Sequence, residues 1–287
     1  MHLTTHNPRV AFQGERGAFS EEAVFTLLGA SAKPSPSATF ESTFAALDGG
    51  RVDYALVPLE NTLAGSIHRT YDLLLESKFH IIAEVIIPVV HNLIGCRGAT
   101  LADVKIVQSH PVALSQCLRF FEQHPDIHRR NAEDTAGSVR EVLEKGDPTV
   151  AAIAARRAAE LYGGSILLEH LEDDPENYTR FVLLSPEPNE TPDANKLSLA
   201  TKLKHQPGAL HSALGIFAKH KVNLSKIESR PLKGSPWEYR FYLDLEVGTA
   251  TLMREVLREF QGLADETRVL GWYRAAQSPS NAELNSR

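Results

Sequence analysis

The chain has 287 residues, of which 43% are hydrophobic and 23% charged, and its formal net charge is −6. These values are typical of a globular chain with one to three domains. The acidic balance and the lack of any basic run argue against a general nucleic-acid-binding role. No segment offers 18 uncharged apolar residues, so we expect no membrane span.

The chain has two cysteines, Cys96 and Cys117, which are too few for a disulfide framework. Cys117 falls on an apolar helical stripe and is predicted to be a small buried side chain. Polar and charged residues interrupt the first ten positions, so no secretory signal is indicated. We therefore expect a reducing, cytoplasmic compartment, or an organelle if a transit peptide has been removed.

Strand and helix signals alternate from residue 8 onward. The run at 54–59 is continuously apolar, as in a strand that is covered on both faces. Ser20 is the expected N-cap of the first helix, which Gly29 ends. A long apolar stretch from Ile81 to Ile94 predicts one strand that crosses between two lobes. The predicted elements of this part are strands at 10–12, 54–59 and 81–94 and helices at 20–28, 40–47 and 67–75.

The alternation restarts beyond residue 94. It predicts strands at 105–107, 149–154, 166–168 and 181–184 and helices along 114–121, 139–143 and 155–162. Such alternation favours parallel sheets with helices on both faces. The chain leaves the first lobe near residue 88 and returns near 170, so we expect residues 8–185 to form two lobes with a ligand cleft between them.

A second domain follows a linker. Ser185–Asp193 contains three prolines and three acidic residues, and we predict a linker over 186–195. From 196 to 276 the patterns run strand, helix, strand, strand, helix, strand, which is the ferredoxin-like order. Residues 277–287 are expected to form a disordered tail.

Three predicted helices begin directly after strands with a small polar residue, at Ser66, Ser109 and Thr135. Helix N-termini present free N–H groups and partial positive charge, so they bind carboxylates. Ordinary capping is the alternative. The segment Pro58–Ile67 is the strongest local candidate for a ligand site, because ligands bind at the carboxyl ends of strands in α/β sheets. A simple connecting loop is the alternative there.

Other chemistries fit poorly. Gly14-Glu15-Arg16-Gly17 lacks the spacing of a phosphate-binding loop. The twelve histidines do not pair at helical spacing within a helix, so we expect no metal. There is no Gly-x-Ser-x-Gly elbow, and neither cysteine has an evident activating partner, so covalent catalysis is not expected.

The chain changes abruptly from polar to apolar along Asp173–Leu184. Thr179 and Arg180 therefore lie where a polar loop enters the core, and their desolvated polar groups need partners. A satisfied structural arginine is one interpretation, and a functional pair is the other.

The segment Asn177–Phe181 resembles the signature of prephenate dehydratases. Eight other segments match the family in the same order, and together they are highly specific. They are Gln13–Ser20, Pro58–Thr62, Tyr71–Leu74, Ser109–Pro111, Gln116–Cys117, Asp134–Ala136, Glu228–Pro231 and Pro236–Glu238. The resemblance covers residues 8 to 276. It implies a two-lobed α/β catalytic domain of the periplasmic-binding-protein type, fused to a regulatory ACT domain of ferredoxin-like βαββαβ fold.

The resemblance implies conversion of prephenate to phenylpyruvate in phenylalanine biosynthesis, with loss of CO2 and water and without a cofactor. It implies that Thr179 is catalytic and that Asn61, Ser109 and Gln116 belong to the site, although periodicity alone predicts a solvated Gln116. Arg180 either pairs with a substrate carboxylate or ties the lobes together. The full expected set of substrate-binding residues is Asn61, Thr62, Ser66, Ser109, Gln116, Thr135, Arg180 and Phe181.

The chemistry asks little of the protein. Decarboxylation delivers electrons to the ring, and departure of the hydroxyl completes an aromatic system. The protein therefore needs to supply orientation and a donor to the leaving oxygen. Because a threonine hydroxyl is a weak acid, we interpret Thr179 as a hydrogen-bond donor, worth about 2.7–4 kcal/mol of barrier.

ACT domains pair side by side, so the resemblance implies a homodimer or homotetramer that binds phenylalanine as an allosteric effector. Backbone N–H groups after Pro207-Gly208 suit an amino-acid carboxylate, and a simple turn is the alternative. His211 stands where the family has an apolar residue, which leaves the strength and sign of control open. The implied effector residues are Gly208, Ala209, Leu210, Asn223, Leu224, Glu228, Ser229, Arg230 and Pro231.

Two other functions stay open at the level of sequence. The Gln13–Ser20 motif is similar to that of arogenate dehydratases, which act on the amine that corresponds to the keto acid prephenate. A non-catalytic sensor of a small carboxylate is the second alternative. Thr179 discriminates against the sensor, because pure binding needs no donor at a leaving group.

Overall fold

The structure is a computed structural model that describes residues 6–189, 191–232 and 235–277. Apart from the chain ends, it divides into two compact units, one made of Asp72–Glu84 and Val182–Ser278 and the other of Thr5–Tyr71 and Val85–Phe181. The expected tail at 277–287 lies outside the described residues except for Gln277.

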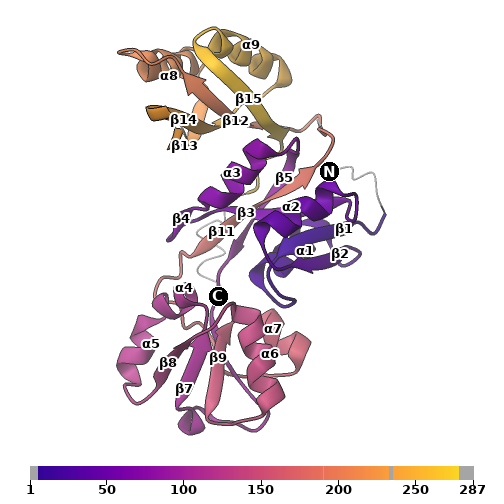
Figure 1. Cartoon of the computed structure of the whole chain (residues 1–287), viewed down its shortest axis with the longest axis vertical. Helices are drawn as coiled ribbons and strands as arrows, with labels where there is room; N and C mark the ends of the chain where they lie inside the picture. The colour runs from indigo at the N-terminus through magenta and orange to yellow at the C-terminus, as the bar shows by residue number, and fades with distance from the viewer. Residues whose placement is uncertain (1–5, 190, 233–234, 278–287) are drawn as a thin grey trace. The chain divides into compact units, whose positions relative to one another are not determined.

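The first sheet has six strands in the order β2-β1-β3-β11-β5, with β4 paired to β3 (Figure 1). The pairs of β1 with β2 and with β3 are parallel, and β4 is antiparallel. The bounds are β1 (Arg9–Gln13), β2 (Lys33–Ser37), β3 (Tyr54–Asn61), β4 (Gly65–Ser66), β5 (His80–Pro88) and β11 (Tyr178–Ser185), with helices α1 (Phe19–Leu28), α2 (Phe40–Asp48) and α3 (His68–Glu76). β3 is almost entirely buried, as its apolar run predicts.

Two expectations for this region are wrong. The N-cap of α1 is Ala18, and Ser20 lies buried in the first turn instead of capping the helix. The expected strand from Ile81 to Ile94 is two strands, because β5 ends at Pro88 and β6 (Asn92–Gly95) belongs to the second sheet. The residues between them bond elsewhere: the N–H of Val89 donates to Asn177 and that of His91 to Glu172.

The second sheet has five strands in the order β10-β6-β9-β7-β8. β7 is parallel to β8 and β9, and β6 is antiparallel to β9 and β10. The bounds are β7 (Ile106–Ser109), β8 (His128–Asn131), β9 (Val150–Ala154) and β10 (Ser165–Leu168), with the 3-10 turn η1 (Leu101–Asp103) and helices α4 (Pro111–Ser115), α5 (Leu118–Gln123), α6 (Thr135–Lys145) and α7 (Arg156–Tyr162).

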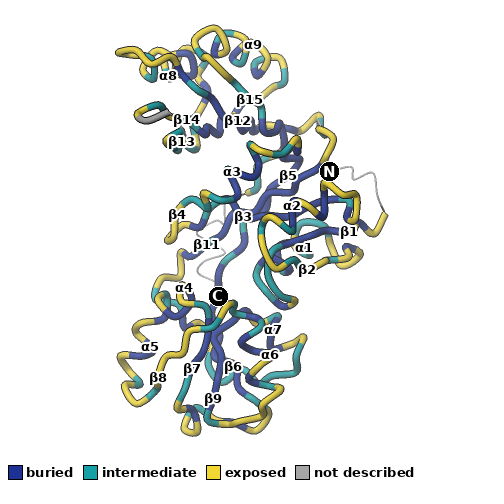
Figure 2. Tube along the Cα trace, viewed as in Figure 1, coloured by how far each residue is buried: buried dark blue, intermediate teal, exposed yellow. Residues whose placement is uncertain are grey.

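Helices cover both faces of this second sheet. On one face, Ala151 and Ile153 of β9 pack in a core with residues of α4 and α5. On the other, Ala152 and Ala154 pack in a core with residues of α6 and α7. Figure 2 shows the resulting burial of β7 and β9 between half-exposed helices. The parallel-rich α/β class predicted from the sequence is therefore confirmed.

The single helix expected along 114–121 is wrong. Two short helices, α4 and α5, meet at Gln116 and Cys117. The carboxylate of Asp173 accepts hydrogen bonds from the backbone N–H of Leu118 (2.7 Å) and of Arg119 (3.0 Å), and so caps the second helix. This cap lies more than fifty residues away in sequence, so local periodicity does not reveal the break. Cys117 is buried, as expected.

The third sheet lies in the C-terminal part of the chain. Its strands are antiparallel in the order β13-β14-β12-β15, and its core residues come from these strands and from α8 and α9. The rings of Phe217 and Phe260 stack at 5.2 Å between the two helices. The bounds are β12 (Lys196–Leu203), α8 (Ala209–Lys219), β13 (Asn223–Leu232), β14 (Ser235–Glu246), α9 (Ala250–Gln261) and β15 (Ala264–Tyr273). The predicted βαββαβ order is confirmed.

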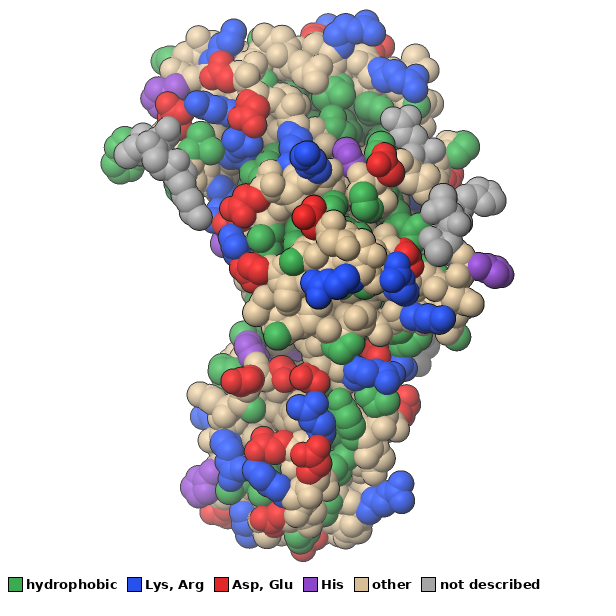
Figure 3. Space-filling view, turned by 45° about the vertical axis from the view of Figure 1, so that its right-hand side comes forward, with side chains coloured by type: hydrophobic (Ala, Val, Ile, Leu, Met, Phe, Trp, Pro, Cys, Tyr) green, Lys and Arg blue, Asp and Glu red, His purple; other side chains and the backbone are tan. Residues whose placement is uncertain are grey.

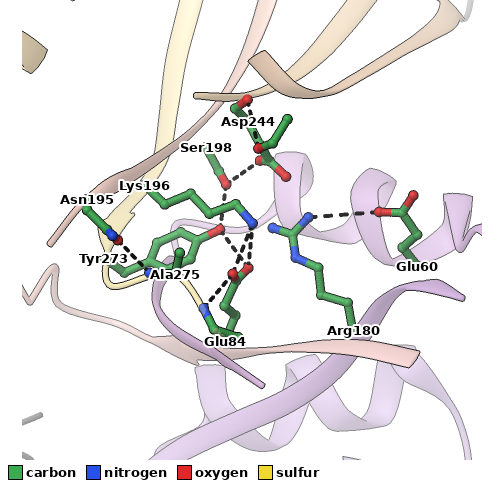
Figure 4. A network of polar contacts seen from close by, with 11 residues as sticks. Glu60, Glu84, Arg180, Asn195, Lys196, Ser198, Asp244, Tyr273 and Ala275 are labelled. Atoms are coloured by element: carbon green, nitrogen blue, oxygen red, sulfur yellow. Dashed lines mark hydrogen bonds and ion pairs between the residues drawn. The ribbon is translucent and has the colours of Figure 1, made fainter. Parts of the chain in front are cut away.

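The same compact unit joins this sheet to β5 and α3. The ammonium of Lys196 donates to both oxygens of Glu84, at 2.9 and 3.0 Å, and both side chains are nearly buried (Figure 4). The guanidinium of Arg268 donates to the carbonyls of Leu75 and Phe79. Gly271 lies against Ile81 so closely that a Cβ at Gly271 would lie 2.2 Å from the carbonyl oxygen of Ile81.

Acidic and basic side chains intermingle on the face drawn in Figure 3, without a large area of one sign. Within the described ranges, no helix has the length and hydropathy that a membrane crossing requires. In the same ranges, no three His, Cys, Asp or Glu side chains gather in a way that suits a metal ion.

Candidate active site

A cavity of about 500 Å³ lies within the unit made of residues 5–71 and 85–181. Its walls come from the loop after β1, the start of α1, the ends of β3 and β7, the β5–β6 connection and the start of α6. The polar lining residues are Gln13, Ser20, Asn61, His91, His110, Gln116, Glu133, Asp134, Thr135 and Thr179. This size suits a small metabolite.

Thr179 lies in the cavity wall near the start of β11 and is 9% exposed. Its Oγ1 accepts a hydrogen bond from Asn61 Nδ2 at 3.0 Å. Asn61 is the last residue of β3, the neighbour of β11 in the sheet. Because Asn61 supplies the proton of this bond, the O–H of Thr179 is left to donate to another group.

The orientation of the Asn61 amide follows from its surroundings. Its Oδ1 accepts hydrogen bonds from the backbone N–H of Leu63 (3.0 Å) and of Ala64 (2.8 Å). A backbone N–H can only donate, so the oxygen must face this loop and the nitrogen must face Thr179. The loop after β3 thereby makes Thr179 an acceptor from Asn61 and a donor toward the cavity.

Two residues outside the expected set belong to the same hydrogen-bond network: His91 lines the cavity, and Asn177 lies buried behind the lining. The Asn177 side chain is 1% exposed and bonds to Asn61 at 2.7 Å and to Gln116 at 3.1 Å. Gln116 Oε1 also lies 2.9 Å from Nε2 of His91, which is 2% exposed. Asn177 belongs to the Asn177–Phe181 motif, but only its hydrogen bonds to Asn61 and Gln116 connect it to the site. His91 lies within the apolar stretch Ile81–Ile94, whose pattern predicts a single strand.

Burial favours the neutral form of His91. It lowers the pKa of the imidazole, and this outweighs the Gln116 hydrogen bond and the nearby Glu172 carboxylate, which both favour the charged form. The His91 and Phe19 rings are nearly perpendicular, with 5.8 Å between their centroids. A neutral imidazole offers one donor and one acceptor, so its tautomer matters for the site.

Residues at the start of several helices line the cavity. Ala18 offers α1 no side-chain cap, and the first turn of this helix faces the cavity through Phe19 and Ser20. At α6, by contrast, Asp134 caps the helix through the N–H of Gly137 at 2.6 Å. The uncapped start of α1 is therefore better suited to an external carboxylate than the expected start of α6.

The loop Gly14–Gly17 is held by a buried carboxylate. Glu21 accepts hydrogen bonds from the N–H of Gly17, from Arg16 and from Arg157, at 2.8–3.0 Å. Burial by itself would raise the pKa of Glu21, but these hydrogen bonds outweigh it and lower the pKa. Gly17 has φ +85° and lies so close to Ala158 that a Cβ would be 2.9 Å from its Cα.

The structure brings the expected catalytic residue together with only part of the expected substrate-binding set. Asn61, Gln116, Thr135 and Thr179 line the cavity. Five others lie outside its lining: Thr62, Ser66, Ser109, Arg180 and Phe181.

Each of these five has another place. Thr62 links the backbone at Glu176 and Tyr178 through its hydroxyl. Ser66 belongs to β4. Ser109 is fully buried and donates to the carbonyl of Ile153 at 2.6 Å. Arg180 and Phe181 follow Thr179 on β11. The guanidinium of Arg180 lies 3.9 Å from Glu60 (Figure 4). Phe181 is buried.

The expected effector residues lie in the third sheet and its first helix. Gly208 adopts φ +79° at the start of α8, and Ala209 and Leu210 line a small cavity of about 160 Å³. The remaining expected residues, Asn223, Leu224, Glu228, Ser229, Arg230 and Pro231, belong to β13. Arg230 lies 3.4 Å from Asp72 of α3, in the same compact unit.

A cavity at the ends of sheet strands, walled by buried hydroxyl, amide and imidazole groups, defines an α/β protein that acts on a small polar molecule. A family model described as prephenate dehydratase matches residues 10–189. The chain belongs to the prephenate dehydratase family.

Individual relatives extend the match over most of the chain. Arogenate dehydratase/prephenate dehydratase 1 of Arabidopsis thaliana, a chloroplastic protein, is 40% identical over 92% of this chain and 71% of its own length. The solved prephenate dehydratase of Arthrobacter aurescens in complex with L-Phe is 31% identical, with TM-score 0.84 over 97% of this chain and 96% of that one.

A third similar protein has a different description. GqqA, described as a novel type of quorum quenching acylase, is 35% identical, with TM-score 0.85 over 94% of this chain and 98% of that chain. The proteins that are similar to this chain therefore carry more than one described activity.

Proposed function

We propose that this protein is a prephenate dehydratase, which converts prephenate to phenylpyruvate, CO2 and water. The bond from the ring to its carboxylate breaks and leaves its electron pair in the ring. The C–O bond of the ring hydroxyl breaks as the aromatic system forms, and the departing oxygen gains a proton to become water. Orientation and stabilisation of the leaving oxygen are what the protein must supply.

One observation carries this proposal. Thr179 lies in the wall of the cavity with its Oγ1 held by Asn61 Nδ2, at 3.0 Å, so that its own proton can be donated. A hydroxyl donor fixed by a buried amide suits an oxygen that gains negative charge in the transition state. It does not need to reorganise when the charge develops.

Removal of this hydroxyl tests the proposal. Thr179→Val is expected to lower kcat for prephenate about a hundred- to thousandfold, the usual effect of losing one such donor. Thr179→Ser keeps the hydroxyl and serves as the matched control, which should retain most of the turnover. The absorbance of phenylpyruvate measures the rate. Near-normal turnover by Thr179→Val would refute the role, and an inactive wild-type protein would refute the function.

Arogenate is the second candidate substrate. The cavity lining that the structure describes contains the carboxylates Glu133 and Asp134 and no lysine or arginine. A substrate with an ammonium group in place of the keto oxygen gains attraction from such carboxylates. Assays of both substrates on the same preparation decide between them: a higher kcat/KM for arogenate would reverse the order proposed here.

The similarity to an acylase does not change this proposal. Hydrolysis of an amide by a threonine hydroxyl requires a base that removes its proton. The partner of Thr179 Oγ1 is an amide nitrogen, which donates a proton and does not accept one. The contact therefore favours a donor role for Thr179 over a nucleophilic role.

Phenylalanine is the proposed effector, and a second copy of the chain is the proposed partner. β13 is an edge strand with no buried residue along its ten positions. Ile227, Trp237 and Tyr239 add exposed apolar side chains on β13 and β14. An edge strand with exposed apolar neighbours suits pairing with an identical strand, in a homodimer or homotetramer.

Free Cys96 and Cys117 suit a reducing compartment, which we propose is the cytoplasm.

A further inference from the structure

Five side chains form one continuous chain of hydrogen bonds behind the cavity. Asn61 Nδ2 donates to Asn177 Oδ1 at 2.7 Å, and its two protons also serve Thr179 Oγ1 at 3.0 Å and the carbonyl of Tyr178 at 3.1 Å. Asn177 Nδ2 bonds to Gln116 Oε1 at 3.1 Å, and this oxygen lies 2.9 Å from His91 Nε2. Asn177 is the central member, because it alone touches both Asn61 and Gln116.

The direction of every bond in this chain can be assigned. The backbone N–H groups of Leu63 and Ala64 occupy Asn61 Oδ1, so the nitrogen of Asn61 must donate to Asn177. Asn177 therefore accepts with its oxygen and donates with its nitrogen. Gln116 must therefore turn its side-chain oxygen toward Asn177. The same oxygen faces His91, so Gln116 can only accept a hydrogen bond from the imidazole.

The last step fixes the tautomer of His91. An imidazole nitrogen that faces an acceptor must carry the proton, so His91 has its proton on Nε2 and a lone pair on Nδ1. Within the described residues, no hydrogen-bond partner reaches Nδ1. The backbone N–H groups of Leu63 and Ala64, after β3, thus determine which ring nitrogen of His91, after β5, carries the proton.

We propose that Asn177 is a positioning residue that transmits this hydrogen-bond direction to both ends of the chain, so that Thr179 donates into the cavity and His91 keeps its proton on Nε2. An amide is the group that this place requires, because it offers an acceptor and a donor side by side. The bond directions do not depend on a substrate, whereas their effect on turnover rests on the proposed function.

The substitution Asn177→Asp hardly changes the shape of the side chain, but it replaces the N–H donor that faces Gln116 with an acceptor oxygen. In its ionised form, which pH 9 favours, the new carboxylate still accepts from Asn61 but cannot donate to Gln116. Gln116 is expected to turn its amide over and to donate to both neighbours. His91 Nε2 then becomes an acceptor, and its proton moves to Nδ1.

Nitrogen-15 NMR of the labelled full-length protein reports the tautomer, with the His91 signals assigned by their loss in His91→Gln. We expect the Nε2–H form in the wild-type protein and the Nδ1–H form in Asn177→Asp, both at pH 9. Gln116→Glu is the matched control: its carboxylate accepts from both neighbours, so His91 should keep its proton on Nε2.

The tautomer of His91 in each protein either supports or overturns the proposal. A wild-type His91 with its proton on Nδ1 overturns the proposal without any variant, which covers the case of a misfolded Asn177→Asp. A folded Asn177→Asp that keeps the Nε2–H form also overturns it.

Turnover gives a separate readout. In Asn177→Asp, we expect kcat/KM for prephenate to fall about ten- to hundredfold, the usual effect of a misdirected buried hydrogen bond. Unchanged kinetics together with a moved proton would overturn the positioning role. An inactive wild-type protein would refute the proposed function, while the NMR result would still judge the bond directions.

Discussion

At the scale of single residues, Glu21 shows how one buried side chain can hold a loop of the site. Its carboxylate has no exposed surface and binds Gly17, Arg16 and Arg157, which anchors the Gly14–Gly17 loop to α1 and α7. Its lowered pKa means that the folded state prefers the charged form. Such a group stabilises the fold above its unfolded pKa, and the effect is lost as the pH falls through the folded pKa.

Glu21→Gln should therefore destabilise the protein at pH 7 by about 2 kcal/mol, since charged hydrogen bonds to a buried acceptor are lost. The difference from wild type should shrink as the pH falls through the lowered pKa of Glu21, because the wild-type carboxylate then becomes protonated as well. Urea unfolding at pH 7 and at acidic pH measures this difference in the free energy of unfolding. The exposed Glu122→Gln on α5 is the control, and an equal loss at both pH values would contradict the prediction.

Sequence alone could predict the site residues whose roles follow from a motif or a strand end. Thr179, Asn61 and Thr135 are predicted in this way, and all three line the cavity. His91 could not be found, because a histidine within an apolar stretch carries no local signal of its partner at position 116. The contact of Ser109 could not be predicted for the same reason: its hydroxyl donates to the carbonyl of Ile153, more than forty residues away in sequence.

At the scale of elements, Gly271 permits the close contact between β15 and β5. A Cβ at this position would meet the backbone of Ile81, which cannot move aside as a flexible side chain can. Gly271→Ala should therefore destabilise the protein by about 1–3 kcal/mol, measured as a lower Tm.

Gly215→Ala provides the matched control for this prediction. Gly215 lies within α8, and a Cβ there meets no atom within 4 Å. Alanine in a helix interior is favoured over glycine by about 1 kcal/mol, so this variant should be stabilised. A neutral Gly271→Ala would show that β15 and β5 can move apart without cost.

The elements that the sequence did not predict are mainly edge strands. β2 is Lys-Pro-Ser-Pro-Ser, and prolines argue against a strand unless it lies at an edge, where a missing N–H removes no ladder bond. β8 is fully exposed and has no apolar residue to mark it. Buried strands such as β3 and β9 were predicted, because burial on both faces leaves an apolar run in the sequence.

At the scale of the whole molecule, Arg230 relates the proposed effector residues to the rest of the chain. In the described structure it contacts Asp72 on α3, within the same compact unit. If phenylalanine acts through this contact, Arg230→Ala and Asp72→Asn should both weaken its effect on prephenate turnover, while the basal rate is retained.

The response to phenylalanine, measured as turnover against effector concentration, tests this coupling. The exposed Arg258→Ala on α9 removes a similar charge and should leave the response unchanged. A normal response in Asp72→Asn with a weakened one in Arg230→Ala would show that Arg230 binds the effector without acting through α3.

The buried ion pair of Lys196 and Glu84 has a consequence for any dissection of this protein. A fragment that begins in the 186–195 segment would lack Glu84, the partner of Lys196, and the two carbonyls that Arg268 binds. Cations stripped of their buried counterparts are costly. An excised C-terminal fragment would therefore be less stable than its regular βαββαβ topology suggests, unless residues 72–84 were supplied with it.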